Sequence, residues 1–392
     1  MKYSGLLFQA ASAAAAITHP GLLHTEADFE RIRSLVEAKT EPQTTGWNKL
    51  AALADASYTP SAQETICRGS GCDPENYPSL YRDAASAYAN AVYWKVTGTK
   101  ANADTAASIL DAWSGTLTTV TGSSDKFLAS GLYGYQLANA AEILRDYGSW
   151  EGLQDIITLL EGVFLPMNVD FLQDHNDAED DHYWANYPTG QWDLCNLASL
   201  HAIGVLSDNQ TAIHQAITYF REGVGMGALD NAIWKIHEEE GSGKPLGQGQ
   251  EAGRDQGHSL LDFGLLGVFA QQAYNQGEDL FSWDDNKILA GAEYVFKYNV
   301  GEDVPFSTYT NVQGTATEIS SSGRGELRPI AELLYAHYNG VKGLNASWTG
   351  AYRDLVLEDG DGAEGGSGDY GSTSGGYDNF GFGTALFRLD SE

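Results

Sequence analysis

Apolar residues recur every three to four positions along most of this chain, and that spacing constrains its fold more than any other feature. The period matches one face of an α-helix, which must be buried against another element. Period-two alternation, typical of half-buried strands, is scarce before the C-terminal segment. The periodic segments predict helices over residues 25–36, 78–96, 103–113, 132–144, 153–163, 192–206, 212–220, 258–274, 288–298 and 330–338.

Local signals mark where several of these helices begin and end. Thr25 is a suitable N-cap, and Gly98 is a suitable residue just past a C-terminus. Pro166 predicts the end of the helix that begins at residue 153. The loops are short, and neither a linker nor an internal repeat is evident. The prediction is therefore an all-α fold, a single domain of stacked helical hairpins.

The N-terminus has the pattern of a signal peptide over residues 1–17, followed by one domain over residues 18–392. Lys2 supplies a positive charge, residues 6–16 are apolar or small, and residues 13–16 are alanines suited to cleavage. The apolar run is too short to span a bilayer. We expect a secreted protein, and the alternative is a buried N-terminal helix.

Sequons and cysteines fit an extracellular chain. Two N-glycosylation sequons begin at Asn209 and Asn345. Cys67 and Cys72 bracket a short Gly-rich loop that a disulfide would close in an oxidising compartment. Cys195 falls within an apolar helical pattern, so we expect a buried free thiol there. No second cysteine pair or paired histidine follows at the spacing of a zinc site.

The charge balance restricts the partners of the chain. Lys and Arg number 22 against 53 Asp and Glu, which makes a formal net charge of −31. Phosphate backbones and anionic membranes require a basic face, so we expect neither nucleic acid nor a membrane as a partner. An anionic polymer would bind only where the few cations gather in one site.

Four segments interrupt the helical pattern with polar, aromatic and Gly residues: 174–192, 238–258, 300–328 and 359–383. Functional side chains concentrate in such loops on a rigid scaffold. The last segment is rich in Gly, Ser and Asp, but its spacing matches no EF-hand. We interpret it as a solvated loop that closes the fold rather than as a calcium site.

The first of these segments holds an aromatic cluster, Tyr183, Trp184 and Tyr187, beside Asn186. Aromatic rings stack on sugar faces, and an Asn amide donates to a carboxylate or hydroxyl. The cluster therefore suits a carbohydrate cleft. The alternative is that the aromatic residues belong to the core and Asn186 to a turn.

The second segment places Arg254, Gln256 and His258 directly before a strongly apolar helix, close to Glu251. His258 falls at the helix N-terminus, where the helix dipole disfavours the imidazolium form. A neutral imidazole there would accept a proton or hydrogen-bond a substrate. The alternative is that Asp255 or Gln256 caps the helix and His258 is incidental.

The third segment contains Tyr309 and, further along, Arg324 between two glycines and Arg328 before Pro329. A tyrosine and two arginines on irregular backbone are able to face a cleft. The glycines beside Arg324 let the backbone approach a ligand closely. Arg328 has an alternative role as the partner of acids at a helix start.

Five segments form a specific combination: HYWANY, GQGQEAGRDQGHSLLDFGLLGVFAQQAYN, AEYVFKYNVGEDVPF, GRGELRPIAELLYAHY and GDYGSTSGGYDNFGFGTALF. Together they resemble the alginate lyase-like polysaccharide lyases of the chondroitin AC and alginate lyase superfamily, and most of all the group that contains glucuronan lyases. The resemblance runs from about His19 to the C-terminus. One departure is the insertion PTGQ between Tyr187 and Trp192, at the edge of the expected cleft.

The resemblance implies an (α/α) toroid of six to seven helical hairpins with a long cleft across one end. It also implies β-elimination on a uronic-acid polymer, β-1,4-glucuronan or alginate, without a metal or organic cofactor. The C5 proton becomes acidic only when the neighbouring carboxylate is neutralised, which amide, histidine and arginine donors can do. A tyrosine or histidine then removes that proton, and a tyrosine protonates the leaving O4.

Carried over residue by residue, the resemblance matches Asn186 and His258 to catalytic positions and makes Arg254 and Arg324 candidates for binding uronate groups. With the loop residues added, the predicted catalytic set is Asn186, His258, Tyr309 and Arg324, and the predicted substrate-binding set is Arg254, Tyr183, Trp184, Tyr187 and Gln256. Better-known relatives have a tyrosine a few residues after the histidine, and residues 259–269 contain none. Tyr309 is chosen because it lies in a loop. Tyr183 and Tyr187 are alternatives, and Tyr298, which ends an amphipathic helix, is expected in the core. The expected partner is an anionic uronic-acid polysaccharide, and the expected state is a monomer.

Two other functional classes stay open at this point. A glycoside hydrolase would use a carboxylate pair on the same toroid, either Glu251 with Asp255 or Asp180 with Asp181. A non-catalytic carbohydrate-binding protein would hold the polymer through aromatic rings. The product distinguishes the classes, because only elimination makes a conjugated unsaturated uronate.

Overall fold

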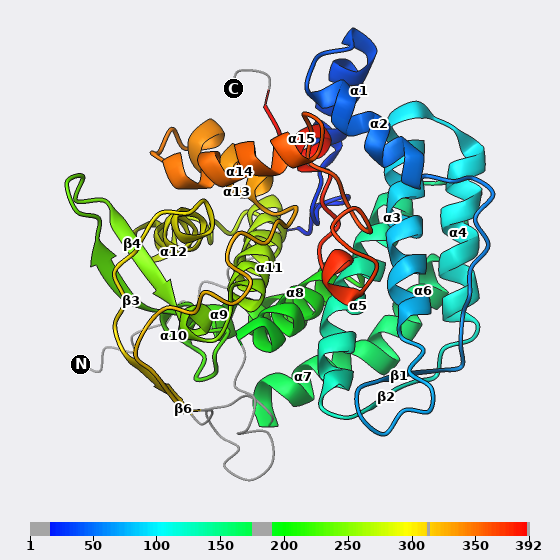
Figure 1. The fold of residues 1–392 in the computed structure, drawn as a ribbon. Coiled ribbons are helices and arrows are strands. Elements are labelled where there is room, and N and C mark those ends of the chain that lie inside the picture. Colours follow the sequence, from blue (N-terminus) through cyan, green and yellow to red (C-terminus); the bar gives the residue numbers. More distant parts are fainter. Residues whose placement is uncertain (1–15, 175–189, 312–313, 390–392) are drawn as a thin grey trace, which may run out of the picture.

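The structure, a computed structural model, describes residues 16–174, 190–311 and 314–389. Within these residues helices dominate, joined by mostly short connections (Figure 1). The helices are α1 (Glu26–Ala38), α2 (Gln43–Leu53), α3 (Pro78–Thr97), α4 (Lys100–Ser114), α5 (Asp125–Leu144), α6 (Leu153–Leu159), α7 (Leu165–Asp174), α8 (Gly190–Leu206), α9 (Gln210–Glu222), α10 (Leu229–Ala232), α11 (Gln256–Asn275), α12 (Trp283–Asn299), α13 (Ala331–Tyr335), α14 (Ser347–Asp359) and α15 (Gly383–Leu386).

Four helices form the inner wall, and each packs on the next: α3 on α5, α5 on α8, and α8 on α11. Their hairpin partners α4, α9 and α12 lie outside them (Figure 1). The hairpin of α13 and α14 packs against α11 and α12, and α15 packs on α2 and α1 near the start of the chain. The all-α prediction and the (α/α) toroid of helical hairpins are confirmed.

The inner helices carry apolar or small residues on nearly every side, because every side is buried. In α5, each residue from Ala129 to Leu144 is buried. Glycines let α5 approach α8 closely: a Cβ on Gly131 would lie 2.2 Å from Sγ of Cys195, the buried free thiol that the sequence predicts. Larger side chains there would force the two helices apart.

The C-terminal segment fills the middle of the toroid between α3 and α11 (Figure 1). The ring of Phe380 stacks on that of Tyr88 in α3, with centroids 3.7 Å apart. The interpretation of residues 359–383 as a solvated loop is therefore wrong for much of its length. Its glycines allow tight packing in the core, where Glu364 and Asp378 are buried.

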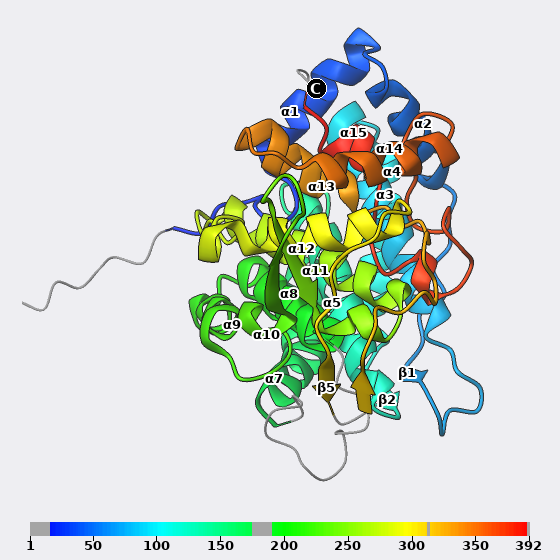
Figure 2. The ribbon, with the colours of Figure 1, turned by 60° about the vertical axis from the view of Figure 1, so that its left-hand side comes forward.

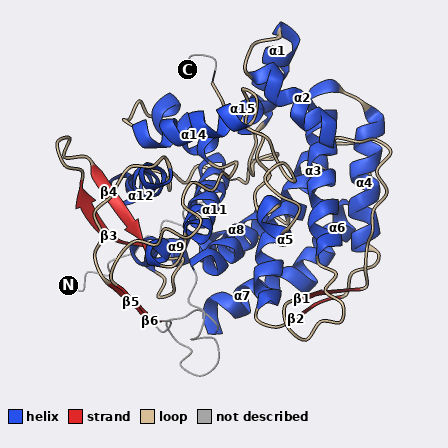
Figure 3. Ribbon diagram, in the orientation of Figure 1, coloured by secondary structure: helices blue, strands red, loops and turns tan. Residues whose placement is uncertain are grey.

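In the described parts of the chain, three small two-stranded sheets supplement the helices (Figure 3). They are β1 (Thr65–Arg68) with β2 (Thr119–Gly122) in parallel, and the antiparallel pairs β3 (Ile233–Glu238) with β4 (Pro245–Gly249) and β5 (Tyr309–Asn311) with β6 (Gly314–Ala316). In the turned view of Figure 2, β5 lies at the same end of the molecule as β2 and α7. The helix-dominated sequence pattern did not predict these strands, because each is too short for a clear alternation.

Helix boundaries follow the local signals with one exception. Thr25 forms a capping box with Asp28, and Gly98 takes the left-handed conformation after α3. Pro166 does not end its helix: α6 continues through a π-helical turn, Leu160–Phe164, into α7. A π-helical turn shifts the hydrogen-bond register, and a residue without an N–H is tolerated at such a shift. Across the described residues, no helix is both long and apolar enough to cross a membrane.

Candidate active site

A pocket of about 500 Å³ is lined by Arg68, Arg254 and Arg328, and we call it the arginine pocket. Its other described lining residues are Asp125, Leu128, Trp192, Asp255, Gly257, His258, Leu261, Glu326, Ser374, Gly375 and Asp378. The chain has only 22 Lys and Arg in all, against 53 acids. The pocket therefore brings three guanidinium groups together, beside the carboxyl groups of Asp125, Asp255, Glu326 and Asp378.

The first turns of three inner helices border the arginine pocket. Asp125 and Leu128 belong to the start of α5, Trp192 to that of α8, and His258 to that of α11. Backbone N–H groups of a first turn lack intrahelical partners and carry the positive end of the helix dipole. The positive ends of these helices add to the charge of the arginines, and the carboxyl groups of Asp125, Asp255, Glu326 and Asp378 oppose it.

The ring of His258 is held by Asp255, the N-cap residue of α11. Asp255 Oδ1 accepts the backbone N–H of His258 at 2.8 Å, and Asp255 Oδ2 lies 2.6 Å from His258 Nδ1. Burial alone would raise the pKa of Asp255, but hydrogen bonds from His258 outweigh it and lower that pKa below its ordinary value. Asp255 therefore caps α11, as one of the two sequence alternatives predicts, and the same carboxylate also contacts the ring of His258.

Arg254 lies in the turn before α11, between two carboxyl groups. Its Nη1 is 3.5 Å from Glu251 Oε2, and its Nε is 3.8 Å from Asp255 Oδ2. Burial raises the pKa of Glu251 to about 7, although the charge of Arg254 opposes the rise. Burial also raises the pKa of Asp262 well above its ordinary value. Protonated Glu251 competes weakly with a ligand carboxylate for Arg254, whereas ionised Asp255 stays close to the guanidinium group.

Arg68 follows Cys67 at the end of β1, and the disulfide between Cys67 and Cys72 closes the loop beside it. Its Nη1 donates to the Tyr133 hydroxyl and its Nη2 to Ser374 Oγ, both at 3.0 Å. The sequence pattern of this loop indicates only a disulfide. No local pattern marks Arg68, because the rest of the pocket comes from distant parts of the chain.

Arg328 lines the same pocket and is tied to two acids. Its Nε is 3.1 Å from Glu326 Oε1, and its Nη1 is 3.6 Å from Asp378 Oδ2. Burial raises the pKa of Asp378, and Arg328 opposes that rise. The expected pairing of Arg328 with acids is therefore present, and it coexists with a position in the pocket wall.

A second pocket of about 240 Å³ borders the first, and Arg254 lines both. We call it the tyrosine pocket, and its described lining is Gln250, Glu251, Gly253, Arg254, Tyr309, Asn311, Gly314, Thr315 and Ala316. The Tyr309 ring lies 5.1 Å from that of Trp234, and its hydroxyl is 3.8 Å from Met226 Sδ. Arg254 thus connects the pocket of His258 to that of Tyr309.

Arg324 and Gln256 lie outside the described lining of both pockets. Gln256 is buried, its Nε2 donates to the Ser320 carbonyl at 3.0 Å, and its Oε1 accepts from Asn299 at the same distance. Arg324 contacts Tyr298, which is buried at the end of α12. The structure therefore does not bring these two side chains to His258.

Several predicted site residues lie outside the described residues. They are Tyr183, Trp184, Asn186 and Tyr187 of the aromatic cluster, together with Asp180 and Asp181 of the hydrolase alternative. Residues 1–15 of the predicted signal peptide also fall there. In the described parts of the chain, no group of three or more His, Cys, Asp or Glu is arranged to hold a metal ion.

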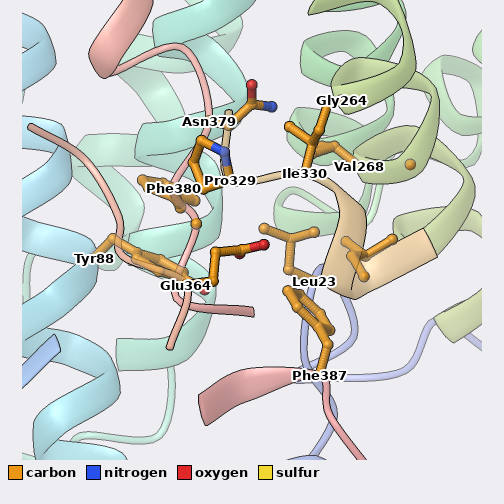
Figure 4. Close-up of a pocket in the computed structure, with 13 residues that line it drawn as sticks. Leu23, Tyr88, Gly264, Val268, Pro329, Ile330, Glu364, Asn379, Phe380 and Phe387 are labelled. Carbon is orange, nitrogen blue, oxygen red and sulfur yellow. The ribbon is translucent and has the colours of Figure 1, made fainter. Parts of the chain in front are cut away.

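A third cavity, of about 30 Å³, lies inside the fold (Figure 4). Its lining includes Leu23, Tyr88, Ile330, Phe380 and Phe387, and the Glu364 carboxyl group points into it (Figure 4). Burial, and then the nearby Glu332 carboxylate, raise the pKa of Glu364 to about 8. A space that holds about one water molecule belongs to the core rather than to a substrate site.

The alginate lyase family model matches residues 35–306, which is more than half of the chain. Among curated proteins, no sequence matches this one. The family match includes Arg68, Arg254 and His258, and it ends before Arg328.

Solved alginate lyases share the fold over almost the whole chain. The enzyme from Bacteroides ovatus aligns with a TM-score of 0.61 at 12% identity, over 95% of this chain and 100% of that one. Alginate lyase A1-III from Sphingomonas species A1 aligns with a TM-score of 0.58 at 13% identity, over 96% and 98%. A histidine-to-alanine variant of A1-III complexed with a tetrasaccharide gives 0.59 at 12% identity, over 95% and 98%. At these identities the alignments establish the shared toroid.

Proposed function

This chain belongs to the alginate lyase family and is a polysaccharide lyase, and we propose that it cleaves a uronic-acid polymer by β-elimination where the arginine and tyrosine pockets meet. The observation that carries the proposal is the meeting of three arginines and His258 in one pocket of a chain with net charge −31. The family name favours alginate, and the resemblance in sequence favours β-1,4-glucuronan.

The first task is to neutralise the uronate carboxylate next to C5. Arg254 suits it, because a planar guanidinium binds a carboxylate through two parallel hydrogen bonds. Glu251 remains partly protonated near neutral pH, so it leaves the guanidinium charge available. Asn186 is proposed to donate an amide hydrogen bond to the same carboxylate. Hydrogen bonds and charge at this group stabilise the enolate that develops as the C5–H bond weakens.

The second task is to move two protons. His258 Nε2 accepts the proton from C5, the C5–H electron pair forms the C4=C5 double bond, and the C4–O4 bond breaks with its electron pair on O4. Tyr309 donates its hydroxyl proton to O4. His258 then returns a proton to Tyr309 through solvent, and the new non-reducing end is a 4,5-unsaturated uronate.

Further uronates of the chain would contact the remaining cations. We assign Arg68 and Arg328 to neighbouring carboxylates, since both line the arginine pocket. Stacking of sugar rings on Tyr183, Trp184 and Tyr187 remains part of the proposal. The hydrolase alternative is not favoured by the family match.

Secretion is part of the same proposal. The Cys67–Cys72 disulfide supports it, because such bonds persist in oxidising compartments. Asn345 is exposed, two residues before the start of α14. Asn209 caps α9 and is half-buried. Recovery of the mature chain from a culture medium, with its N-terminus sequenced, tests the cleavage after residue 17.

The decisive experiment follows ultraviolet absorbance of the conjugated uronate during incubation with glucuronan, polymannuronate and polyguluronate. A rise on one polymer, unchanged by a chelator, is the expected result. His258→Ala and Asn186→Ala are expected to abolish the rise while melting like the parent protein. New reducing ends without absorbance would indicate hydrolysis instead, and binding without either signal would indicate a carbohydrate-binding protein.

A further inference from the structure

We propose that Asp255 is a positioning residue that sets the tautomer of His258, keeping the proton on Nδ1 and the lone pair of Nε2 turned to the substrate. This inference rests on the proposed function, in which His258 is the base. It concerns a residue that acts through the ring of His258.

Both oxygens of the Asp255 carboxylate are used by one residue. Oδ1 accepts the backbone N–H of His258 at 2.8 Å, which fixes the first turn of α11. Oδ2 lies 2.6 Å from Nδ1 of the same histidine. Two contacts from one side chain hold both the backbone and the ring of His258, so the ring direction is set by the helix cap.

The chemistry of the two partners decides the tautomer. An ionised carboxylate only accepts hydrogen bonds, so Nδ1 must carry the proton. The pKa of Asp255 lies below its ordinary value because hydrogen bonds from His258 overcome the effect of burial, which keeps the carboxylate ionised near neutral pH. In neutral imidazole the lone pair is then on Nε2. The ring is 37% exposed and lines the arginine pocket, so a substrate can reach it.

Asp255 also reaches the carboxylate-binding arginine. Nε of Arg254 lies 3.8 Å from the same oxygen, Oδ2, that contacts His258 Nδ1. Arg254 and His258 are therefore positioned by one carboxylate. A change at Asp255 should disturb proton transfer through the tautomer even where the fold and Arg254 are preserved.

The variant that isolates the tautomer is Asp255→Asn. Its amide oxygen can still cap α11, while its NH₂ group faces Nδ1 and donates to it, which moves the ring proton to Nε2. We expect kcat to fall about a thousandfold or more, with KM and the melting temperature close to those of the parent protein. Asp255→Ser is the matched control, because it keeps the cap without donating to the ring, and we expect a smaller loss.

Nitrogen-15 spectra of histidine-labelled protein provide a readout that a purely structural role would not change. The His258 signals are identified by their absence in His258→Gln. We expect the Nδ1–H tautomer in the parent protein and the Nε2–H tautomer in Asp255→Asn. If Asp255→Asn does not fold, loss of the fixed tautomer in Asp255→Ser carries the test.

The outcomes separate the two proposals. An Nε2–H tautomer in the parent protein, or an unchanged spectrum in a folded Asp255 variant, overturns the positioning role. A changed tautomer with undiminished kcat also overturns it, provided that His258→Ala is inactive. Full activity of His258→Ala would instead remove the histidine base from the proposed function, while the spectra still report whether Asp255 controls the ring.

Discussion

The guanidinium carbon of Arg324 lies 3.9 Å from the centre of the Tyr298 ring. Its Nε and Nη2 donate at 2.9 Å to the carbonyl oxygens of Tyr298 and Glu302. A cation over an aromatic face, together with carbonyls near the C-terminus of α12, is a stabilising arrangement. These contacts hold the loop after β6 against α12.

Replacing Arg324 by Gln is therefore expected to affect stability more than turnover. Loss of the cation–π contact and of two hydrogen bonds should lower the free energy of unfolding by about 1–2 kcal/mol. Urea unfolding measures the loss, and kcat/KM on the best polymer should change little. A large fall in kcat with unchanged unfolding would place Arg324 among the catalytic groups.

Arg254→Lys is expected to lower kcat/KM by about 100-fold or more, although the charge is kept. A lysine ammonium cannot bind a carboxylate through a planar pair of N–H groups, so the enolate loses stabilisation. Arg221→Lys is the matched control, because Arg221 stacks on Trp283 and contacts Glu278 outside both pockets. Equal effects of the two substitutions would contradict the role of Arg254.

Tyr309→Phe should reduce kcat by about 10²–10⁴-fold, because the leaving O4 loses its proton donor while the ring contact with Trp234 is kept. Tyr298→Phe is the comparison. Tyr298 is buried under Arg324, so its hydroxyl is expected to matter little for turnover. Melting curves of both variants are required. If Tyr309→Phe remains active and a folded Tyr298→Phe variant is inactive, Tyr298 rather than Tyr309 is the general acid.

Stability should depend on pH through Glu364. Its pKa is about 8 in the folded chain against an ordinary value of 4.5. The folded state keeps a proton that the unfolded chain releases, so this contribution is complete below about pH 4.5 and is lost as pH rises through about 8. The Glu364→Gln variant does not ionise at this position. Above pH 8 its free energy of unfolding should therefore exceed that of the parent protein by roughly 3–5 kcal/mol.

Urea unfolding at pH 5 and pH 9 measures the effect of Glu364→Gln. The difference in the free energy of unfolding between the variant and the parent protein should be larger at pH 9 than at pH 5. Glu358→Gln, on an exposed position of α14, serves as the control that should show no such dependence. An equal gain in the free energy of unfolding at pH 5 and at pH 9 would mean that packing, rather than ionisation, is responsible.

Removing the disulfide with the pair Cys67→Ser and Cys72→Ser should weaken substrate binding through Arg68. The loop beside Arg68 gains freedom, so KM is expected to rise several-fold with little change in kcat, and stability should fall by about 2 kcal/mol. Steady-state kinetics and thermal melting report both. An unchanged KM would show that the contacts to Tyr133 and Ser374 suffice to place Arg68.

Helix content was predictable from the sequence because a 3.6-residue period is a local property. The segment ending at Gly98 and the cap at Thr25 follow from residues a few positions apart. The π-helical turn before Pro166 was not predictable, since it depends on how neighbouring helices accommodate a shifted register. The burial of residues around Glu364 was missed for a similar reason, because a Gly-rich segment has the same local pattern in solvent and in a core.

Some residues of the candidate site were likewise predictable from the sequence, and others were not. Arg254, Asp255 and His258 lie within one turn of chain, so their sequence proximity already made them a candidate group. Tyr309 was proposed from its loop and reaches the same region through the shared position of Arg254. Arg68 and Arg328 are 260 positions apart along the sequence, and no spacing rule relates them.

The sequence by itself determined the helical class, the acidic character that makes clustered cations informative, and the turn that joins Asp255 to His258. These depend on periodicity, composition and contacts between near neighbours. Only the tertiary structure decided that the first turns of α5, α8 and α11 meet one another, and that β1 and the C-terminal segment bring arginine and acid to the same place. The physical reason is that burial of the inner helices, a property of the whole toroid, sets which helix ends converge and therefore where the three arginines meet His258.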